Sequence, residues 1–218
     1  RLVAEIIDAD PWGDVPFVAT RYVPGWSLHE QVAREGPLEG DDLVWFARCL
    51  ARAIGAVHAV GVVHRDIKPS NILMEGRTPV LIDFGLLRPV TTDTSVVGTP
   101  GWLAPEVAAG RPGGKPADVH GVGAVALDLI VGEPPRLDGA PAARTRLRES
   151  LDRRGVERSD QLADHLAALL ATDPSQRPTD LGRWARELRA ILEGRAPDPA
   201  AGRRRWMVAA VVGVLGIG

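Results

Sequence analysis

Four polar residues in the first half of the chain have the types and the spacing needed for chemistry on a phosphate group. Asp66 and Lys68 stand two positions apart, Asn71 follows them closely, and Asp83 comes after the next apolar stretch. A carboxylate can orient a hydroxyl group or accept its proton, and a nearby ammonium group can neutralise the charge of a phosphoryl group in transfer. These residues therefore predict a site where a hydroxyl group meets a phosphate.

Asn71 and Asp83 lie at the outer ends of two short apolar segments that we expect to pair as antiparallel strands. The segments, 71–74 and 80–82, flank a turn over 75–79. Paired ends of this kind lie side by side, about 5 Å apart. An amide oxygen and a carboxylate that converge there suit Mg²⁺, a hard cation that prefers oxygen ligands and keeps positions open for phosphate and water.

Three segments of the sequence, taken together, resemble the eukaryotic-type protein kinases. Residues 64–71, with the sequence HRDIKPSN, are similar to the catalytic loop of that family. The triplet Asp83-Phe84-Gly85 is similar to its metal-binding triplet, and the sequence APE at 104–106 is similar to the end of its activation segment. Taken singly, these residue types are usually structural, but the three segments occur in the order and spacing of the family.

The resemblance covers residues 1 to about 193 and implies both a fold and a set of catalytic roles. The implied fold is α+β and protein kinase-like, made mostly of the helical C-lobe with a remnant of the N-lobe sheet. By this resemblance Asp66 is the catalytic base and Lys68 contacts the γ-phosphate of ATP. Asn71 and Asp83 would then hold Mg²⁺ next to the nucleotide.

The resemblance also implies which residues receive the adenine of ATP. Residues 16–23, with the sequence PFVATRYV, are similar to the fifth strand and hinge of the family. Thr20 would be the gatekeeper, and the backbones of Arg21 and Val23 would face adenine. The family usually has an acidic residue where Arg21 stands, but backbone contacts survive that change. Leu73 would lie beneath the adenine ring.

Several further matches imply structural roles. Glu106 and Arg177 resemble the buried ion pair that fixes the activation segment of the family. Asp118 resembles the aspartate that holds the backbone of the catalytic loop. Lys68, together with Thr99 in the sequence GTP, is typical of the serine/threonine branch of the family.

The segment between the metal-binding triplet and the APE sequence carries hydroxyl groups that could regulate the site. Its phosphorylation candidates are Thr91, Thr92, Thr94 and Ser95. A phosphorylated hydroxyl group there could bind the Arg65 guanidinium in bidentate fashion, order the segment and align the catalytic base. We favour Thr92 or Thr94, and we exclude Thr99 because its hydroxyl group is expected to face Lys68 and the base. The plainer alternative is that these hydroxyl groups only solvate a loop.

Two features of the kinase family are missing from this sequence. No glycine-rich GxGxxG segment precedes His64, and Lys68 and Lys115 are the only lysines, so neither can be the lysine of the third strand. We therefore expect an N-terminally truncated fragment that starts at the fourth strand of the fold. Such a fragment would have a floor and a hinge for ATP but no cover over its phosphates, and we expect it to be nearly inactive by itself.

Composition and length set the outer limits of the interpretation. The 218 residues are 45% apolar and 25% charged, as in an ordinary globular chain with a sizeable core. A net charge of −2 gives no reason to expect nucleic acid as a partner. The single cysteine, Cys49, excludes an internal disulfide and a cysteine-cluster metal site, and its apolar helical surroundings indicate a packing role.

Hydrophobic periodicity and turn residues outline the elements that must position these residues. Segments 3–7 and 15–19 predict a hairpin, and Ser27 is a candidate N-cap. Apolar residues at helical spacing predict helices over 41–60, 119–131, 147–151, 161–171 and 180–192. The expected organisation is an N-lobe end and hinge over 1–25, a C-lobe over 26–193, a juxtamembrane linker over 194–205 and the start of a transmembrane helix over 206–218.

The C-terminal residues predict a membrane anchor. Arg203, Arg204 and Arg205 precede residues 206–218, which carry no charged side chain, whereas a spanning helix needs about 20 apolar residues. Arginines beside a membrane helix favour the cytoplasmic side. We therefore expect a single-pass protein of the cell membrane with a cytoplasmic kinase domain, as in bacterial receptor-like serine/threonine kinases. The alternative is that 206–218 form a last buried helix.

Three functions fit the sequence. The leading hypothesis is an ATP-dependent kinase that phosphorylates serine or threonine residues of proteins, with a homodimer left open. The second is a catalytically impaired pseudokinase that serves as a membrane scaffold, although the intact Asp66, Asn71 and Asp83 argue against it. The third is a small-molecule phosphotransferase of related fold, which would lack the peptide-docking segment that runs from Gly98 to Glu106.

Overall fold

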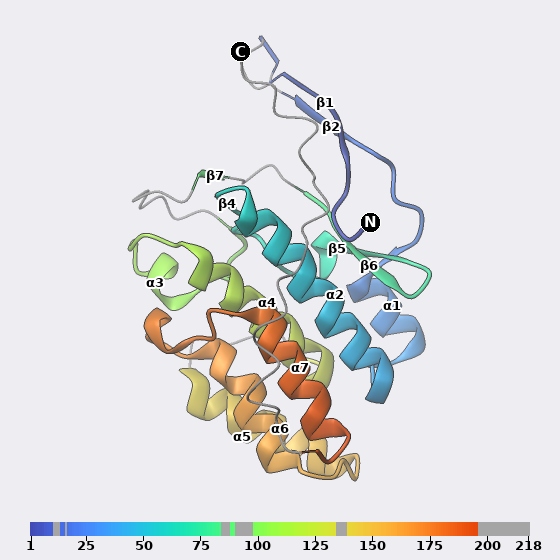
Figure 1. The fold of residues 1–218 in the computed structure, drawn as a ribbon, viewed down its shortest axis with the longest axis vertical. Helices are drawn as coiled ribbons and strands as arrows, with labels where there is room; N and C mark the ends of the chain where they lie inside the picture. The colour runs from blue at the N-terminus through green and yellow to red at the C-terminus, as the bar shows by residue number, and fades with distance from the viewer. Residues whose placement is uncertain (11–13, 16, 84–87, 90–97, 134–138, 196–218) are drawn as a thin grey trace.

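A computed structural model describes residues 1–10, 14–15, 17–83, 88–89, 98–133 and 139–195. In Figure 1 a body of helices lies below a set of small sheets. The helices are α1 (Leu28–Glu35), α2 (Gly40–Ala59), α3 (Pro105–Ala108), α4 (Lys115–Val131), α5 (Gly139–Arg153), α6 (Ser159–Ala167) and α7 (Leu181–Leu192), with three short 3-10 helices, η1 (Pro69–Asn71), η2 (Ala168–Leu170) and η3 (Pro174–Gln176). The strands are β1 (Ile6–Asp10), β2 (Phe17–Thr20), β3 (Trp26–Ser27), β4 (Val62–Val63), β5 (Ile72–Glu75), β6 (Thr78–Leu81) and β7 (Arg88–Pro89). This mixture confirms the expected α+β, mostly helical fold.

The strands β1 and β2 form an antiparallel hairpin that projects from the helical body (Figure 1). Ile6 pairs with Thr20, so β1 begins later than the sequence predicted. The residues before β1 run beside β6 instead, where the Ala4 amide donates to the Leu81 carbonyl (2.9 Å) and the Leu81 amide donates to the Leu2 carbonyl (3.0 Å). The first predicted strand is therefore divided between two partners, which a short apolar run cannot show by itself.

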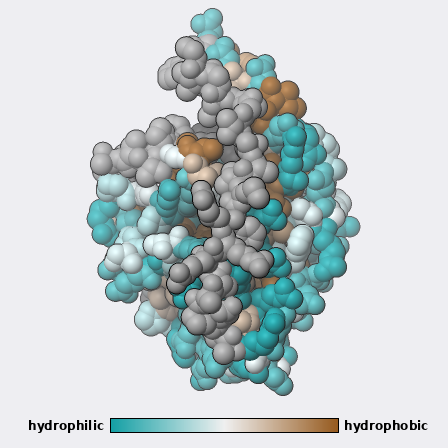
Figure 2. Space-filling view, in the orientation of Figure 1, coloured by the Kyte–Doolittle hydropathy of each residue, from teal (hydrophilic) through white to brown (hydrophobic). Residues whose placement is uncertain are grey.

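The hairpin exposes hydrophobic side chains, of which Ile7 is 67% exposed and Val18 is 47% exposed. Figure 2 shows hydrophobic residues gathered toward this end of the molecule and mostly hydrophilic residues over the helical body. The described residues of β1 and β2 do not belong to the hydrophobic clusters of the described chain. The hairpin is thus held by its own hydrogen bonds and by its connections to the rest of the sheet region.

A second sheet joins β3, β5 and β6 in antiparallel order and lies directly above the helices. Trp26 pairs with Met74, and Ile72 pairs with Leu81. Gly25 leads into this sheet with a φ of 128°, and a Cβ atom there would lie 2.1 Å from the Met74 carbonyl oxygen. Glycine is therefore required where the chain crosses β5.

The predicted N-cap at Ser27 is confirmed. The Ser27 hydroxyl group accepts from the Glu30 amide (3.2 Å), and the Glu30 carboxylate accepts from the Ser27 amide (2.8 Å). Together these bonds form a capping box, which satisfies two backbone donors at the start of α1. This local signal fixes where the chain leaves the sheet and enters the helical body.

The main hydrophobic core lies between α2, α4 and the C-terminal helices (Figure 1). Helix α4 is buried along most of its length, as its continuous apolar run predicted. A Cβ atom on Gly123 would lie 2.6 Å from the Leu169 Cβ atom, so α4 and η2 approach closely. Cys49 on α2 is 2% exposed, which confirms its packing role.

Within the part of the chain that the structure describes, the helices are too short or too polar to span a bilayer. The expected transmembrane segment, 206–218, and most of the expected linker, 194–205, lie outside the described residues. Both therefore stay predictions from sequence.

Candidate active site

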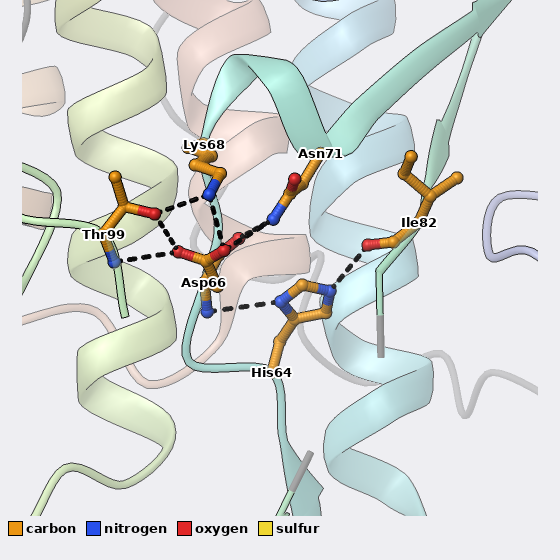
Figure 3. A network of polar contacts seen from close by, with 6 residues as sticks. All are labelled: His64, Asp66, Lys68, Asn71, Ile82 and Thr99. Atoms are coloured by element: carbon orange, nitrogen blue, oxygen red, sulfur yellow. Dashed lines mark hydrogen bonds and ion pairs between the residues drawn. The ribbon is translucent and has the colours of Figure 1, made fainter. Parts of the chain in front are cut away.

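The catalytic-loop residues are carried by the short connection between β4 and β5. The chain leaves β4 at Val63, passes through His64 and Asp66, and re-enters regular structure at η1, which ends at Asn71. Figure 3 shows the side chains of this connection converging with Thr99, which comes from a separate segment. The site is therefore assembled from segments that are far apart in the sequence.

Asp66 is the centre of this network, and each of its carboxylate oxygens accepts two hydrogen bonds. Oδ1 accepts from the Thr99 amide (3.1 Å) and the Thr99 hydroxyl group (2.7 Å). Oδ2 accepts from Lys68 Nζ (2.7 Å) and Asn71 Nδ2 (2.8 Å). Lys68 Nζ also donates to the Thr99 hydroxyl oxygen (2.5 Å), so the expected meeting of Thr99 with Lys68 and Asp66 is confirmed (Figure 3).

The electrostatics of the network keep Asp66 ionised. Burial alone would raise the pKa of Asp66. The hydrogen bonds from Lys68 and Thr99, the charge of Lys68 and the hydrogen bond from Asn71 outweigh burial, so the pKa lies below its ordinary value. A carboxylate held in this form can orient an incoming hydroxyl group and accept its proton as the reaction proceeds.

His64 joins the catalytic loop to the end of β6. Its Nδ1 accepts from the Asp66 amide (3.4 Å), and its Nε2 donates to the Ile82 carbonyl (3.2 Å), as Figure 3 shows. Burial lowers the pKa of His64, so the ring is neutral and carries its proton on Nε2 in this arrangement. The sequence marked His64 as part of a motif but gave no partner for it.

The predicted metal pair is placed by the β5–β6 ladder. The Ile82 amide donates to the Asn71 carbonyl (2.9 Å), which extends the ladder by one pair. Asp83 follows Ile82 directly, so it comes just after this pair. The Asn71 Nδ2 atom is committed to Asp66, and its amide oxygen points away from that carboxylate (Figure 3). Asp83 is exposed and adopts a left-handed backbone conformation with a φ of 64°.

These oxygen donors fit Mg²⁺. An amide oxygen and an exposed carboxylate are hard ligands, which Mg²⁺ prefers. Among the described residues, no group of three or more His, Cys, Asp or Glu side chains could hold a metal ion. If Mg²⁺ binds here, Asn71 and Asp83 would be the protein ligands, and the remaining positions would be left to phosphate and water.

The predicted nucleotide residues line the junction between the hairpin and the second sheet. Val23 is 4% exposed and packs in a small hydrophobic cluster with Val80, against which the partly buried Leu73 also packs. Thr20 ends β2 and is exposed. Of these apolar residues, Leu73 is only partly buried, and contacts to adenine stay a prediction.

Arg21 makes an ion pair that the sequence did not predict. Its Nη1 atom lies 3.2 Å from Glu75 Oε1, and its Nη2 atom lies 3.5 Å from Glu75 Oε2. The pair joins the segment after β2 to the end of β5. Arg21, which stands at a hinge position that is usually acidic in the family, therefore has an acidic partner in the second sheet.

The backbone of the catalytic loop is held by Asp118, as the resemblance implied. Its Oδ2 atom accepts from the His64 amide (2.9 Å), and its Oδ1 atom accepts from the Arg65 amide (2.8 Å). Arg65 has a φ of 69°, an uncommon conformation for a residue with a side chain. The two hydrogen bonds hold the loop in this conformation beside Asp66.

Glu106 and Arg177 form the predicted buried ion pair. The two Arg177 Nη atoms each lie 2.7 Å from one Glu106 carboxylate oxygen, and the side chains are 4% and 0% exposed. Arg177 also donates to the carbonyls of Ala171 (2.8 Å) and Pro116 (2.9 Å). Burial alone would raise the pKa of Glu106, but the hydrogen bond from Arg177 lowers it overall.

Some predicted site residues lie outside the described residues. These are Phe84, Gly85, Thr91, Thr92, Thr94 and Ser95. Their proposed roles in metal binding and phosphorylation stay predictions. The described ends of the segment, at Asp83 and Gly98, both border the Asp66 network.

The arrangement defines the class of protein. A sequence profile of the protein kinase domain matches residues 8–190. The chain therefore belongs to the protein kinase domain family. The Asp66 network and the buried ion pair of Glu106 and Arg177 lie within the matched residues.

Several curated bacterial proteins are similar to this chain. The probable serine/threonine-protein kinase PkwA of Thermomonospora curvata is 42% identical over 61% of this chain and 18% of its own length. The serine/threonine-protein kinase AfsK of Streptomyces coelicolor is 34% identical over 97% of this chain and 27% of its own length. The serine/threonine-protein kinase PknB of Mycolicibacterium smegmatis is 30% identical over 86% of this chain and 32% of its own length. The chain thus spans less than a third of each of these relatives.

Proposed function

We propose that this chain carries the catalytic loop of a bacterial serine/threonine protein kinase, which transfers a phosphoryl group from ATP to serine or threonine side chains of proteins. The observation that carries the proposal is the Asp66 carboxylate, ionised and held by Lys68, Asn71 and Thr99. The similarity to bacterial enzymes named as serine/threonine kinases supports the choice of acceptor.

The residues of the site divide the work of phosphoryl transfer. MgATP supplies the phosphoryl group when it is bound. Asp66 orients the acceptor hydroxyl group and receives its proton, while the Lys68 ammonium group, 2.7 Å from that carboxylate, lowers the cost of negative charge nearby. Asn71 binds both the backbone carbonyl and the side chain of Asp66, so the base keeps one orientation.

The test is a phosphotransfer assay on the full-length protein with ATP, Mg²⁺ and a mixed protein substrate, followed by analysis of the phosphorylated amino acids. We expect phosphoserine and phosphothreonine, and no transfer when Mg²⁺ is removed by a chelator. Phosphotyrosine as the main product, or phosphorylation of a small molecule but no protein, would contradict the proposal.

A pseudokinase is the second candidate. The lysines of this sequence are Lys68 in the catalytic loop and Lys115 at the start of α4, so the third-strand lysine that separates the two candidates has to be sought in the full-length protein. A pseudokinase scaffold would bind partner proteins but would not transfer phosphate, whether or not it binds a nucleotide. The phosphotransfer assay separates the two functions directly.

We also propose that the protein is anchored in the cell membrane by a single helix that begins near Trp206, with the kinase domain in the cytoplasm. The support is the sequence alone, in which arginines 203–205 precede an apolar run to Gly218. The test is membrane fractionation with protease protection. Recovery of the full-length protein in the soluble fraction would contradict it.

Phosphorylation of the activation segment is a further proposal. Thr92 and Thr94 are the favoured acceptors, and Arg65, next to the base, is the proposed phosphate ligand. The test is phosphosite mapping after incubation with ATP, together with the kinetics of Arg65→Ala. An absence of phosphate over 91–95, with unchanged activation in Arg65→Ala, would contradict it.

A further inference from the structure

Arg21 closes the base of the β1–β2 hairpin and joins that base to the second sheet. Its amide donates to the Glu5 carbonyl (2.7 Å), which connects the two residues that flank the hairpin. Its guanidinium group pairs with the Glu75 carboxylate through two contacts of 3.2 and 3.5 Å. The side chains of Arg21 and Glu75 are 34% and 36% exposed, so the pair is partly shielded from water. One residue therefore connects the hairpin to the end of β5.

The hairpin has a second attachment, which lies on β6. The Ala4 amide donates to the Leu81 carbonyl, and the Leu81 amide donates to the Leu2 carbonyl. Leu81 stands three residues beyond Thr78, which is the residue that pairs with Glu75. At about 3.3 Å per residue, the two attachments lie about 10 Å apart along the sheet. Two points at this separation resist a rotation of the hairpin that one point alone would allow.

Glu75 is presented by a turn that is itself fixed to the helical body. Trp45 on α2 donates its Nε1 proton to the Arg77 carbonyl (3.1 Å), and the Arg77 guanidinium group forms an ion pair with Asp42 on the same helix. The hairpin, in contrast, projects from the body (Figure 1), and the described residues of β1 and β2 pack in neither hydrophobic cluster. The orientation of the hairpin therefore depends on the contacts at its base.

We propose that Arg21 and Glu75 form a latch, which holds the β1–β2 hairpin at one angle to the second sheet and so positions the predicted nucleotide segment 20–23. The effect on the nucleotide rests on the proposed kinase function, whereas the effect on the hairpin does not. The resemblance to the kinase family does not imply this pair, because the family usually has an acidic residue in place of Arg21. Ion pairs of this exposure change an equilibrium by up to about fivefold, so the latch restrains the hairpin without locking it.

The direct test measures the distance between the hairpin and the helical body in the full chain. Spin labels at Val18, which is exposed on β2, and at Asp41, which is exposed at the start of α2, give this distance by electron–electron double resonance, with the buried Cys49 replaced by alanine. Arg21→Glu sets two carboxylates against each other. We expect the fraction of molecules outside the parental distance peak to rise about threefold in this variant. The charge-swapped variant Arg21→Glu/Glu75→Arg should return that fraction to near the parental value.

The matched control is Arg189→Glu, which makes the same change in charge in a pair on α7 whose side chains are 49% and 31% exposed. It should leave the distance unchanged. Arg21→Gln removes the charge without adding repulsion, and it serves as the test variant if denaturant unfolding shows that Arg21→Glu is not folded. An unchanged distance distribution in the folded variant would overturn the proposal. Equal broadening in the single and charge-swapped variants would also overturn it, because the charge of Arg21 would then not be the cause.

Kinetics of the full-length protein give the second readout. If the proposed kinase function holds, Arg21→Glu should raise KM for ATP about threefold, and the charge swap should lower it again, because the predicted nucleotide segment follows the hairpin directly. The change in kcat should be smaller, since the Asp66 network is not touched. A fall in kcat with unchanged KM would contradict the positioning role. If the parent protein transfers no phosphate, the proposed function fails, and the spin-label distances still decide whether the latch holds the hairpin.

Discussion

Each donor around Asp66 restricts this carboxylate in a different way. Lys68 adds a positive charge. Asn71 Nδ2 donates both to the Asp66 carboxylate and to the Asp66 backbone carbonyl, and Thr99 donates from a separate segment of the chain. Because each carboxylate oxygen has two donors, the plane of the group is fixed before any substrate arrives. In the proposed reaction, an acceptor hydroxyl group would therefore meet a carboxylate that is already oriented for proton transfer.

Asp83 offers a residue-scale prediction about the metal. Asp83→Ala should reduce the gain in nucleotide affinity that Mg²⁺ provides by about tenfold or more, because one of two protein oxygen ligands is lost. Affinity without Mg²⁺ should change little. Calorimetric titration of a non-hydrolysable ATP analogue, with and without Mg²⁺, measures both, and Asp41→Ala is the control because Asp41 is exposed at the start of α2. An equal loss under both conditions would show that Asp83 does not hold the ion.

His120 makes stability depend on pH. It is 5% exposed on α4, its Nδ1 atom has no hydrogen-bond partner among the described residues, and burial together with the charge of Arg177 lowers its pKa to about 4. The unfolded chain binds a proton at this histidine below its ordinary pKa of 6.5, whereas the folded chain resists doing so. Folding is therefore destabilised as the pH falls from about 6.5 to 4, by about 2 kcal/mol at pH 5.

His120→Phe tests that pH dependence. The variant has no histidine to protonate at this position. Between about pH 7.5 and pH 5, its free energy of unfolding should therefore fall less than that of the parent protein. The buried His64 and His165, whose pKa values are also lowered, would still contribute in both proteins. Urea unfolding at the two pH values measures the difference. Parallel pH profiles would show that His120 is not responsible.

At the scale of elements, the sequence predicted those helices whose apolar residues form a continuous run or a helical period. The run over 119–131 predicted α4, which begins a little earlier, at Lys115, where Pro116 occupies the first turn. Helix α5 spans Gly139–Arg153, but only 147–151 was predicted, because its arginine-rich exposed face hides the apolar period. The four-residue helix α3 has too few residues to show any period, and it was not predicted.

The contacts between elements were predicted only where a family motif named both partners. Glu106 and Arg177, or Asp118 and the catalytic loop, were identified in this way. The contacts of His58 with Asp118 and of Arg21 with Glu75 were not, because a single histidine or arginine carries no signal of a distant partner. Such pairs are decided by packing, which brings together residues far apart in the chain.

Two bidentate ion pairs between elements allow a matched test of burial. Glu106→Ala should reduce the free energy of unfolding by about 3–5 kcal/mol, because it leaves the fully buried Arg177 without its carboxylate. Glu75→Ala should cost about 1 kcal/mol or less, because its pair with Arg21 is about one-third exposed. Denaturant unfolding of the two variants gives the comparison. Equal costs would show that burial does not set the strength of the Glu106–Arg177 pair.

Across the whole molecule, the helices share one hydrophobic core, and the loops of the site lie at the upper end of this helical body (Figure 1). The catalytic loop is supported from below by Asp118 on α4, and Thr99 reaches it from the segment that precedes α3. Asn71 and Asp83 border the second sheet, which stands between the helical body and the hairpin.

The most direct measurement is the turnover of Asp66→Asn in the full-length protein, with ATP, Mg²⁺ and a serine- or threonine-containing peptide. Because the amide keeps the shape of the side chain but cannot accept a proton, kcat should fall by about 100-fold or more. The unfolding transition and KM for ATP should stay close to those of the parent, and the control Asp41→Asn should keep full turnover. Near-parental turnover in Asp66→Asn would contradict the account, because the base around which this site is built would then be dispensable.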